Sequence, residues 1–195
     1  MNPAAADLLG SASSSPDKPG QEPTPRPVLV LGMGNLLLED EGLGIHTLKL
    51  IQQRFVAPPE VEFLDGGTSG MALIEMLSGR QHLLVLDAVQ TGEAPGTLVT
   101  MNDKDVPVYF GLRSTPHQLG LSDVLATMKL TDEQPGRVTV LGLVPYSLEM
   151  SLDLSVCISE KLHQLVTAVV DELAALGYPL QARSDEDPGQ DEPVS

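Results

Sequence analysis

The stretch VLVLGMGNLLLEDEGLG, residues 28–44, decides the fold of this 195-residue chain. It begins with a run of four Val and Leu residues that ends at Gly32, a pattern typical of a short buried strand. Helical periodicity then predicts a helix from about Leu43 to Phe55. The helix is expected to end there because Pro58 and Pro59 break the pattern. The stretch therefore contains a strand, a long loop and the start of a helix, which is the opening unit of an α/β fold.

The rest of the chain repeats this alternation. Gly177 and Pro179 act as stop signals for a long final helix. Further strands are predicted at residues 61–64, 83–86, 97–101 and 138–143, and further helices at residues 71–77, 116–128 and 155–176. The pattern predicts a three-layer α/β fold of the phosphorylase/hydrolase-like kind, with a twisted, mainly parallel sheet flanked by helices on both sides. Ligands of such folds gather at the carboxyl ends of the strands, so function is expected in the loops there.

Composition divides the chain into one domain and two tails. Residues 1–26 are mostly small or polar and are predicted to form a disordered extension, because such a segment cannot bury enough apolar surface to offset the cost of ordering. Residues 183–195 are predicted to be an acidic disordered tail, with five acidic residues and two prolines. One domain is expected between them, at residues 27–182.

The charge balance excludes two classes of partner. Eleven basic and 27 acidic residues give a net charge of −16, the wrong sign for binding nucleic acid or an anionic membrane. The single cysteine, Cys157, cannot form a disulfide framework or a cysteine-based zinc cluster, which fits a reducing compartment. No run reaches signal-peptide or membrane-span length, so a cytoplasmic protein is expected.

Carboxylates follow the ends of three predicted strands. Asp40 and Glu41 follow the first strand, Asp65 the second and Asp87 the third. His117 lies in the sequence Thr-Pro-His-Gln, which fits a helix N-terminus where the helix dipole disfavours the imidazolium and leaves a neutral imidazole. Two carboxylates and one imidazole, from Glu41, Asp87 and His117, would make an oxygen-rich site for divalent nickel, zinc or manganese.

Other interpretations of the acidic and glycine-rich loops stay open on the residues alone. Asp87 also fits a strand-end cap, and Asp40 or Glu41 a charge at a helix N-terminus. The glycines at residues 32–37 suggest a nucleotide-binding loop, but Leu37 occupies the third glycine position. The DGGTSG loop, residues 65–70, suggests an anion site, although Thr68 or Ser69 capping the next helix would explain it.

Several common catalytic motifs are missing from the sequence. There is no G-x-S-x-G elbow, no H-E-x-x-H helix and no P-loop. Cys157 falls on an apolar helix face and is predicted to belong to the core. The remaining histidines, His46, His82 and His163, are interpreted as structural or surface residues.

Five sequence blocks occur in order along residues 27–182: residues 28–44, DGGTSG at 65–70, LDAV at 86–89, STPHQLGL at 114–121 and VPYSLE at 144–149. Together they resemble the nickel-iron hydrogenase maturation proteases, and the subgroup serving uptake-type hydrogenases in particular. The resemblance implies an endopeptidase, of aspartyl type, that removes the C-terminal peptide of the hydrogenase large-subunit precursor after nickel insertion.

The resemblance also implies roles for individual residues. The family's metal ligands fall on Glu41, Asp87 and His117, and nickel would arrive with the substrate, although other divalent ions could bind. Asp65 would handle substrate or act in catalysis, and Asp65 or Asp87 would be the base.

Two alternative functions are a nickel-binding chaperone that recognises the precursor without cutting it, and a nucleotide-binding domain using Gly32 and Gly34.

Overall fold

The computed structural model describes residues 26–103, 105–106 and 121–184. Its strands are β1 (Val28–Met33), β2 (Phe55–Val56), β3 (Val61–Gly67), β4 (His82–Ala88), β5 (Leu98–Asn102), β6 (Arg137–Leu143) and β7 (Gln181–Ala182). Its helices are α1 (Leu43–Arg54), α2 (Ile74–Leu77), α4 (Leu121–Leu130) and α5 (Val156–Ala175), with the short 3₁₀ helices η1 (Glu39–Gly42) and η2 (Met71–Leu73).

A five-stranded sheet in the order β3-β1-β4-β6-β5 forms the centre of the domain. The first four strands pair in parallel, and β5 is antiparallel to β6. The central strand β4 is buried along its whole length, as expected for a strand with a helix layer on each side. The predicted three-layer, mainly parallel α/β fold is therefore confirmed.

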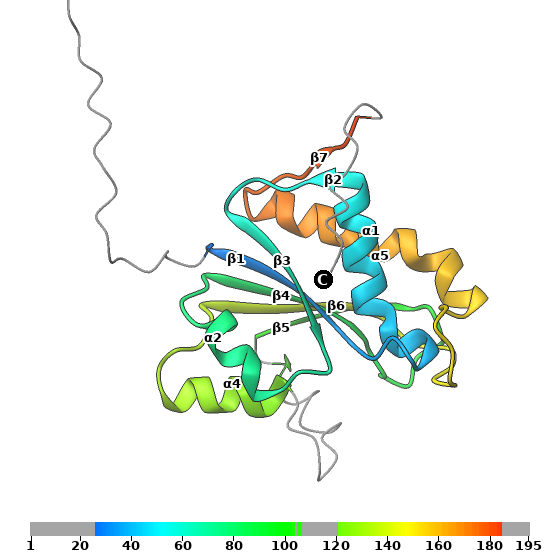
Figure 1. Ribbon diagram of the computed structural model, residues 1–195, viewed down its shortest axis with the longest axis horizontal. Coiled ribbons are helices and arrows are strands. Elements are labelled where there is room, and N and C mark those ends of the chain that lie inside the picture. The colour runs from blue at the N-terminus through cyan, green and yellow to red at the C-terminus, as the bar shows by residue number, and fades with distance from the viewer. Residues whose placement is uncertain (1–25, 104, 107–120, 185–195) are drawn as a thin grey trace, which may run out of the picture.

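Two helix layers cover the sheet, with α1 and α5 on one face and α2 and α4 on the other (Figure 1). Alternate side chains of each strand supply the two cores, because successive residues of a strand point to opposite faces. Val28 and Val30 pack in the core under α1 and α5, whereas Leu29 and Leu31 pack in the core under α2 and α4. The long helix α5 begins with Ser155, whose side chain accepts a hydrogen bond from the Ile158 amide.

Gly44 allows α1 to lie directly on the carboxyl ends of the strands. A Cβ atom at this position would overlap the carbonyl oxygens of Leu86 and Met33. The start of α1, and η1 before it, are therefore held against the ends of β1 and β4.

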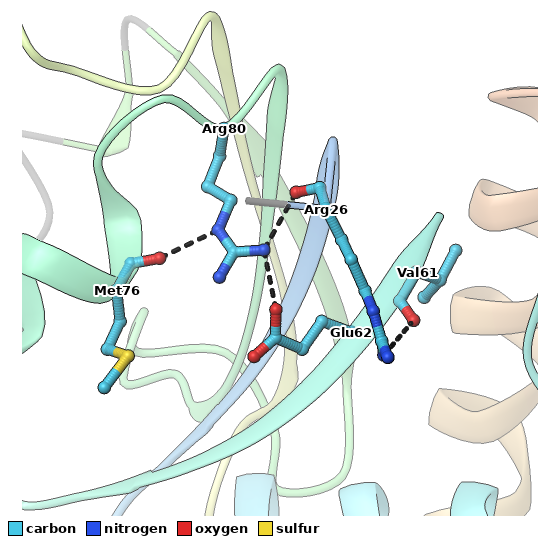
Figure 2. A network of polar contacts seen from close by, with 5 residues as sticks. All are labelled: Arg26, Val61, Glu62, Met76 and Arg80. Atoms are coloured by element: carbon cyan, nitrogen blue, oxygen red, sulfur yellow. Dashed lines mark hydrogen bonds and ion pairs between the residues drawn. The ribbon is translucent and has the colours of Figure 1, made fainter. Parts of the chain in front are cut away.

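The amino ends of the strands are held by a buried arginine (Figure 2). Arg80 donates hydrogen bonds of 2.8 Å to the carbonyl oxygens of Met76 and Arg26 and forms a 2.8 Å ion pair with Glu62. Arg26 in turn reaches the carbonyl oxygen of Val61 at 3.4 Å. These partners lie in β3, in α2 and directly before β1. The network therefore ties three segments together at the amino ends of the strands, far from the acidic loops.

Two details differ from the sequence-based expectations. A two-stranded antiparallel sheet, β2 with β7, was not predicted, and Arg183 follows it with a 2.8 Å bond to the carbonyl oxygen of Arg54. Thr68 and Ser69 do not cap the next helix, because Gly70 holds that position and no side chain caps it. No helix in the described ranges is both long and apolar enough to span a bilayer.

Candidate functional site

Glu41 lies in η1, at the carboxyl edge of the sheet. Its backbone is fixed on both sides, since its amide donates to the Leu38 carbonyl at 3.0 Å and its carbonyl accepts from the Asn35 amide at 3.2 Å. Gly34 packs so closely on this carbonyl that a Cβ atom would overlap it, and its φ of +131° also favours glycine. The side chain of Glu41 is half-buried. The loop after β1 therefore holds Glu41 in one place.

Asp87 is the penultimate residue of β4 and is buried. Its Oδ1 accepts a 2.8 Å hydrogen bond from the Ala88 amide, so the strand-end cap expected as an alternative is present. By the alternation of the strand, Asp87 lies on the same face as Val85, which packs in the core under α2 and α4. Since η1 contacts β4, the segments that carry Glu41 and Asp87 lie side by side.

Asp65 ends the regular part of β3 and is exposed. Its Oδ1 accepts a 2.9 Å hydrogen bond from the Gly67 amide, and the Gly67 carbonyl accepts a 2.9 Å bond from the Gly34 amide. Gly32 of β1 pairs with Asp65 on one side and with Leu86 on the other. Two strand spacings, roughly 10 Å, therefore separate the backbones of Asp65 and the residues next to Asp87.

Asp40 does not belong to the acidic edge with which it was grouped. It is fully buried, and its Oδ2 accepts hydrogen bonds from the amides of Tyr146 and Ser147, at 2.9 and 3.0 Å. Ser155 completes the set, donating from its amide to Oδ1 at 2.8 Å and from its hydroxyl to Oδ2 at 2.9 Å. The carboxylate joins η1 to the segment between β6 and α5, a role that the sequence analysis missed.

His117, the third expected ligand, lies outside the described residues, as does the capping sequence around it. The first described residue after it is Leu121, where α4 begins, and α4 covers the face to which Asp87 belongs. Within the described ranges, no three His, Cys, Asp or Glu residues are grouped as a metal site. Of the three expected ligands, the structure brings together the segments that carry Glu41 and Asp87. Their two carboxylates supply hard oxygen donors, which suit a divalent ion.

The other histidines and the cysteine differ in how deeply they are buried. His82 is buried at the start of β4, with Nε2 3.1 Å from the Thr139 hydroxyl, and burial lowers its pKa. Burial also lowers the pKa of His46 in α1. His163 is exposed on α5, so His82 fits the structural interpretation and His163 the surface one, whereas His46 lies beside Gly42 of η1 with its Nε2 buried and without a hydrogen-bond partner among the described residues. Cys157 is half-buried, less enclosed than the predicted core position.

Comparisons with known proteins identify the family of this fold and site. The family model described as hydrogenase maturation protease matches residues 45–172, a span that includes Asp65, Asp87 and His117 and begins four residues after Glu41. The chain belongs to the hydrogenase maturation proteases. The hydrogenase 2 maturation protease of Escherichia coli K12 is 39% identical over 151 residues, which are 77% of this chain and 92% of that protein.

Further relatives and solved structures agree. The hydrogenase expression/formation protein HupD of Rhodobacter capsulatus is 44% identical over 126 residues, 64% of this chain and 60% of HupD, so the chain matches about three fifths of that relative. The E. coli hydrogenase maturating endopeptidase HybD has the same fold with a TM-score of 0.77 and 39% identity, covering 82% of this chain and 99% of HybD. The maturation protease HycI of Thermococcus kodakarensis, at 19% identity, a TM-score of 0.62 and coverage of 76% and 93%, is similar in fold.

Membership in this family makes the chain a peptidase of hydrogenase maturation, consistent with C-terminal processing of the large-subunit precursor.

Proposed function

We propose that this protease removes the C-terminal peptide from the precursor of a nickel-iron hydrogenase large subunit after nickel insertion, and that Glu41, Asp87 and His117 recognise the nickel in that substrate. The observation that carries the proposal is the contact between η1 and β4, which places the segments of Glu41 and Asp87 together. Nickel arrives with the precursor and is held partly by precursor side chains. Cleavage then depends on metal insertion, because an empty precursor lacks the group that the carboxylates bind.

The two aspartates differ in ways that support different roles. Asp87 is buried and already accepts a hydrogen bond from the Ala88 amide, so its position is fixed, as suits a ligand. Asp65 is exposed, and its Oδ1 accepts the Gly67 amide, so its carboxylate can meet substrate and water. We assign Asp65 the part of general base: it takes a proton from the attacking water, and the proton passes to the departing amine when the peptide bond breaks. This makes the enzyme an aspartate-dependent peptidase.

A cleavage assay on nickel-loaded and nickel-free precursor tests the proposal. Mass spectrometry should detect the C-terminal fragment only from loaded precursor. Glu41→Gln, Asp87→Asn and His117→Ala should each lower the rate at least 100-fold, because each removes one group that binds the nickel. Glu75→Gln, which changes an exposed carboxylate on α2, is the matched control and should cleave at the native rate.

The assay also separates the other functions. Binding of loaded precursor without any fragment would identify a chaperone instead of a protease. Equal cleavage of loaded and nickel-free precursor would refute the nickel recognition but keep the peptidase. We further propose that the protein acts in the cytoplasm, with the hydrogenase precursor as partner, supported by its single cysteine, which fits a reducing compartment.

A further inference from the structure

Large apolar side chains are exposed on one segment beside the candidate site. The segment between β6 and α5 exposes 88% of Met150 and 67% of Leu152, and Tyr146 and Leu148 on the same segment and Val156, the first residue of α5, are exposed as well. Leu37, in the loop before η1, is 60% exposed. We call these six residues, Leu37, Tyr146, Leu148, Met150, Leu152 and Val156, the apolar loop surface. So many exposed apolar groups on one short segment are unusual unless the segment meets a partner.

Backbone hydrogen bonds join the two loops that carry this surface. Ser151 donates from its amide to the Leu37 carbonyl at 3.1 Å, and its carbonyl accepts from the Glu39 amide at 3.0 Å. Leu38 and Ser151 form a parallel bridge. The buried carboxylate of Asp40 holds the same segment at both ends, through Tyr146 and Ser155. The apolar loop surface is thus set in place before any partner binds, which lowers the entropic cost of binding.

The apolar loop surface continues into a pocket whose other wall is the loop that follows β4. This pocket has a volume of about 340 Å³ and lies between residues 144–148 and the loop of Gln90, Gly92 and Glu93. Tyr146 and Leu148 line it, and Gln90 follows Asp87 by three residues. A polypeptide that lies on the apolar loop surface can therefore place a side chain in this pocket, one wall of which is the loop directly after β4.

Carboxylates border the apolar loop surface. Glu93 in the pocket wall, and Glu149 and Asp153 between the apolar residues, are all exposed. A partner segment with acidic residues would meet like charges there, whereas an apolar segment that is neutral or basic would not. A second copy of this chain would bring the same carboxylates against one another and would add a second net charge of −16. The surface is better suited to the substrate than to self-association.

We propose that the apolar loop surface docks the hydrogenase precursor, binding an extended apolar segment, neutral or basic in charge, that lies next to the bond to be cut. The inference rests on the proposed function, because the occupant is the substrate of that same site. Docking supplies affinity through side chains that are not among the reacting groups, so its loss weakens substrate binding and leaves the chemical step in place.

Steady-state cleavage of nickel-loaded precursor by surface variants tests the docking. Met150→Glu combined with Leu152→Glu should raise KM at least tenfold while kcat stays within twofold of the native value. Leu130→Glu is the matched control, because Leu130 is 88% exposed at the end of α4 on the opposite helix layer, and both of its constants should stay within twofold. Thermal midpoints of all variants should match the native protein, since the changed side chains are exposed.

The outcomes separate this inference from the proposed function. A native protein that cleaves the precursor, together with a double variant of unchanged KM, overturns the docking and keeps the protease. A double variant with lower kcat and unchanged KM also overturns the docking. A native protein that produces no fragment overturns both. Sedimentation that detects a native dimer, dissociated by Met150→Glu, would assign the surface to a second copy and overturn substrate docking.

Discussion

Replacing Asp40 tests how strongly the acidic loop is held to the rest of the domain. Asp40→Asn changes little in size but leaves one acceptor oxygen in place of two. Four donors surround the native carboxylate, three at Oδ2 and one at Oδ1. If the amide oxygen takes the Oδ2 position, the new NH₂ group faces the amide of Ser155, and that buried donor loses its partner.

The expected cost follows from the chemistry of these bonds. A buried donor without a partner costs about 1–3 kcal/mol, and hydrogen bonds to a charged acceptor are roughly twice as strong as those to a neutral one. Release of the carboxylate from its buried position returns part of this loss. We expect Asp40→Asn to lower the free energy of unfolding by about 2–3 kcal/mol. At about 2–4 °C per kcal/mol for a chain of this size, the thermal midpoint should fall by roughly 4–12 °C.

Urea unfolding and calorimetry measure this loss directly. Asp171→Asn is the matched control, since Asp171 is exposed on α5 and surface changes of this kind usually stay within about 0.5 kcal/mol. An Asp40→Asn variant as stable as the control would refute the reasoning, because the four hydrogen bonds would then contribute nothing beyond the cost of burying the charge.

Two further predictions concern stability. Burial lowers the pKa of His82 below its usual 6.5, so the folded state disfavours the protonated imidazole. The contribution of the neutral His82 to the free energy of unfolding is therefore complete above about pH 6.5 and is lost as the pH falls from there through the lowered pKa. The loss of urea stability between pH 7.5 and 5.5 should therefore be smaller in His82→Gln than in the native protein or in the exposed-site control His163→Gln; equal losses would contradict this. Gly44→Ala should cost about 2 kcal/mol or more, since the new Cβ overlaps backbone oxygens, whereas Gly92→Ala, with open space around it but a φ of +85°, should cost only about 1 kcal/mol. A Gly44→Ala thermal midpoint above that of Gly92→Ala would refute the close packing.

The fold could be predicted because its signals are local. Each parallel strand is a short apolar run, and each long helix has its own periodicity and end signals, as at Ser155 before α5 and Gly177 after it. The strand β2 and its partner β7 could not be predicted in this way. Each has only two residues, and they pair across more than a hundred residues of intervening chain, so no periodic pattern marks them.

The candidate site also contains features that local sequence patterns predict and features that they do not. The positions of Asp65 and Asp87 at the carboxyl ends of parallel strands were predictable, because these ends share one edge, although both residues lie in the last residues of β3 and β4 and not after them. The burial of Asp40 was not predictable, because its partners Tyr146, Ser147 and Ser155 lie 106, 107 and 115 residues away in the sequence. A long-range hydrogen-bond set decides which of two consecutive carboxylates faces inward, and no spacing rule contains that information.

The geometry of η1 explains how adjacent acidic residues take separate roles. A 3₁₀ helix has three residues per turn, so the side chains of Asp40 and Glu41 point about 120° apart. When Asp40 faces the segment between β6 and α5, Glu41 must face elsewhere, and the contact of η1 with β4 keeps it at the strand ends. The apolar loop surface and the candidate nickel-binding carboxylate are therefore fixed by the same turn. A change that frees the loop from Asp40 disturbs both, whereas a change at Met150 or Leu152 disturbs only the surface.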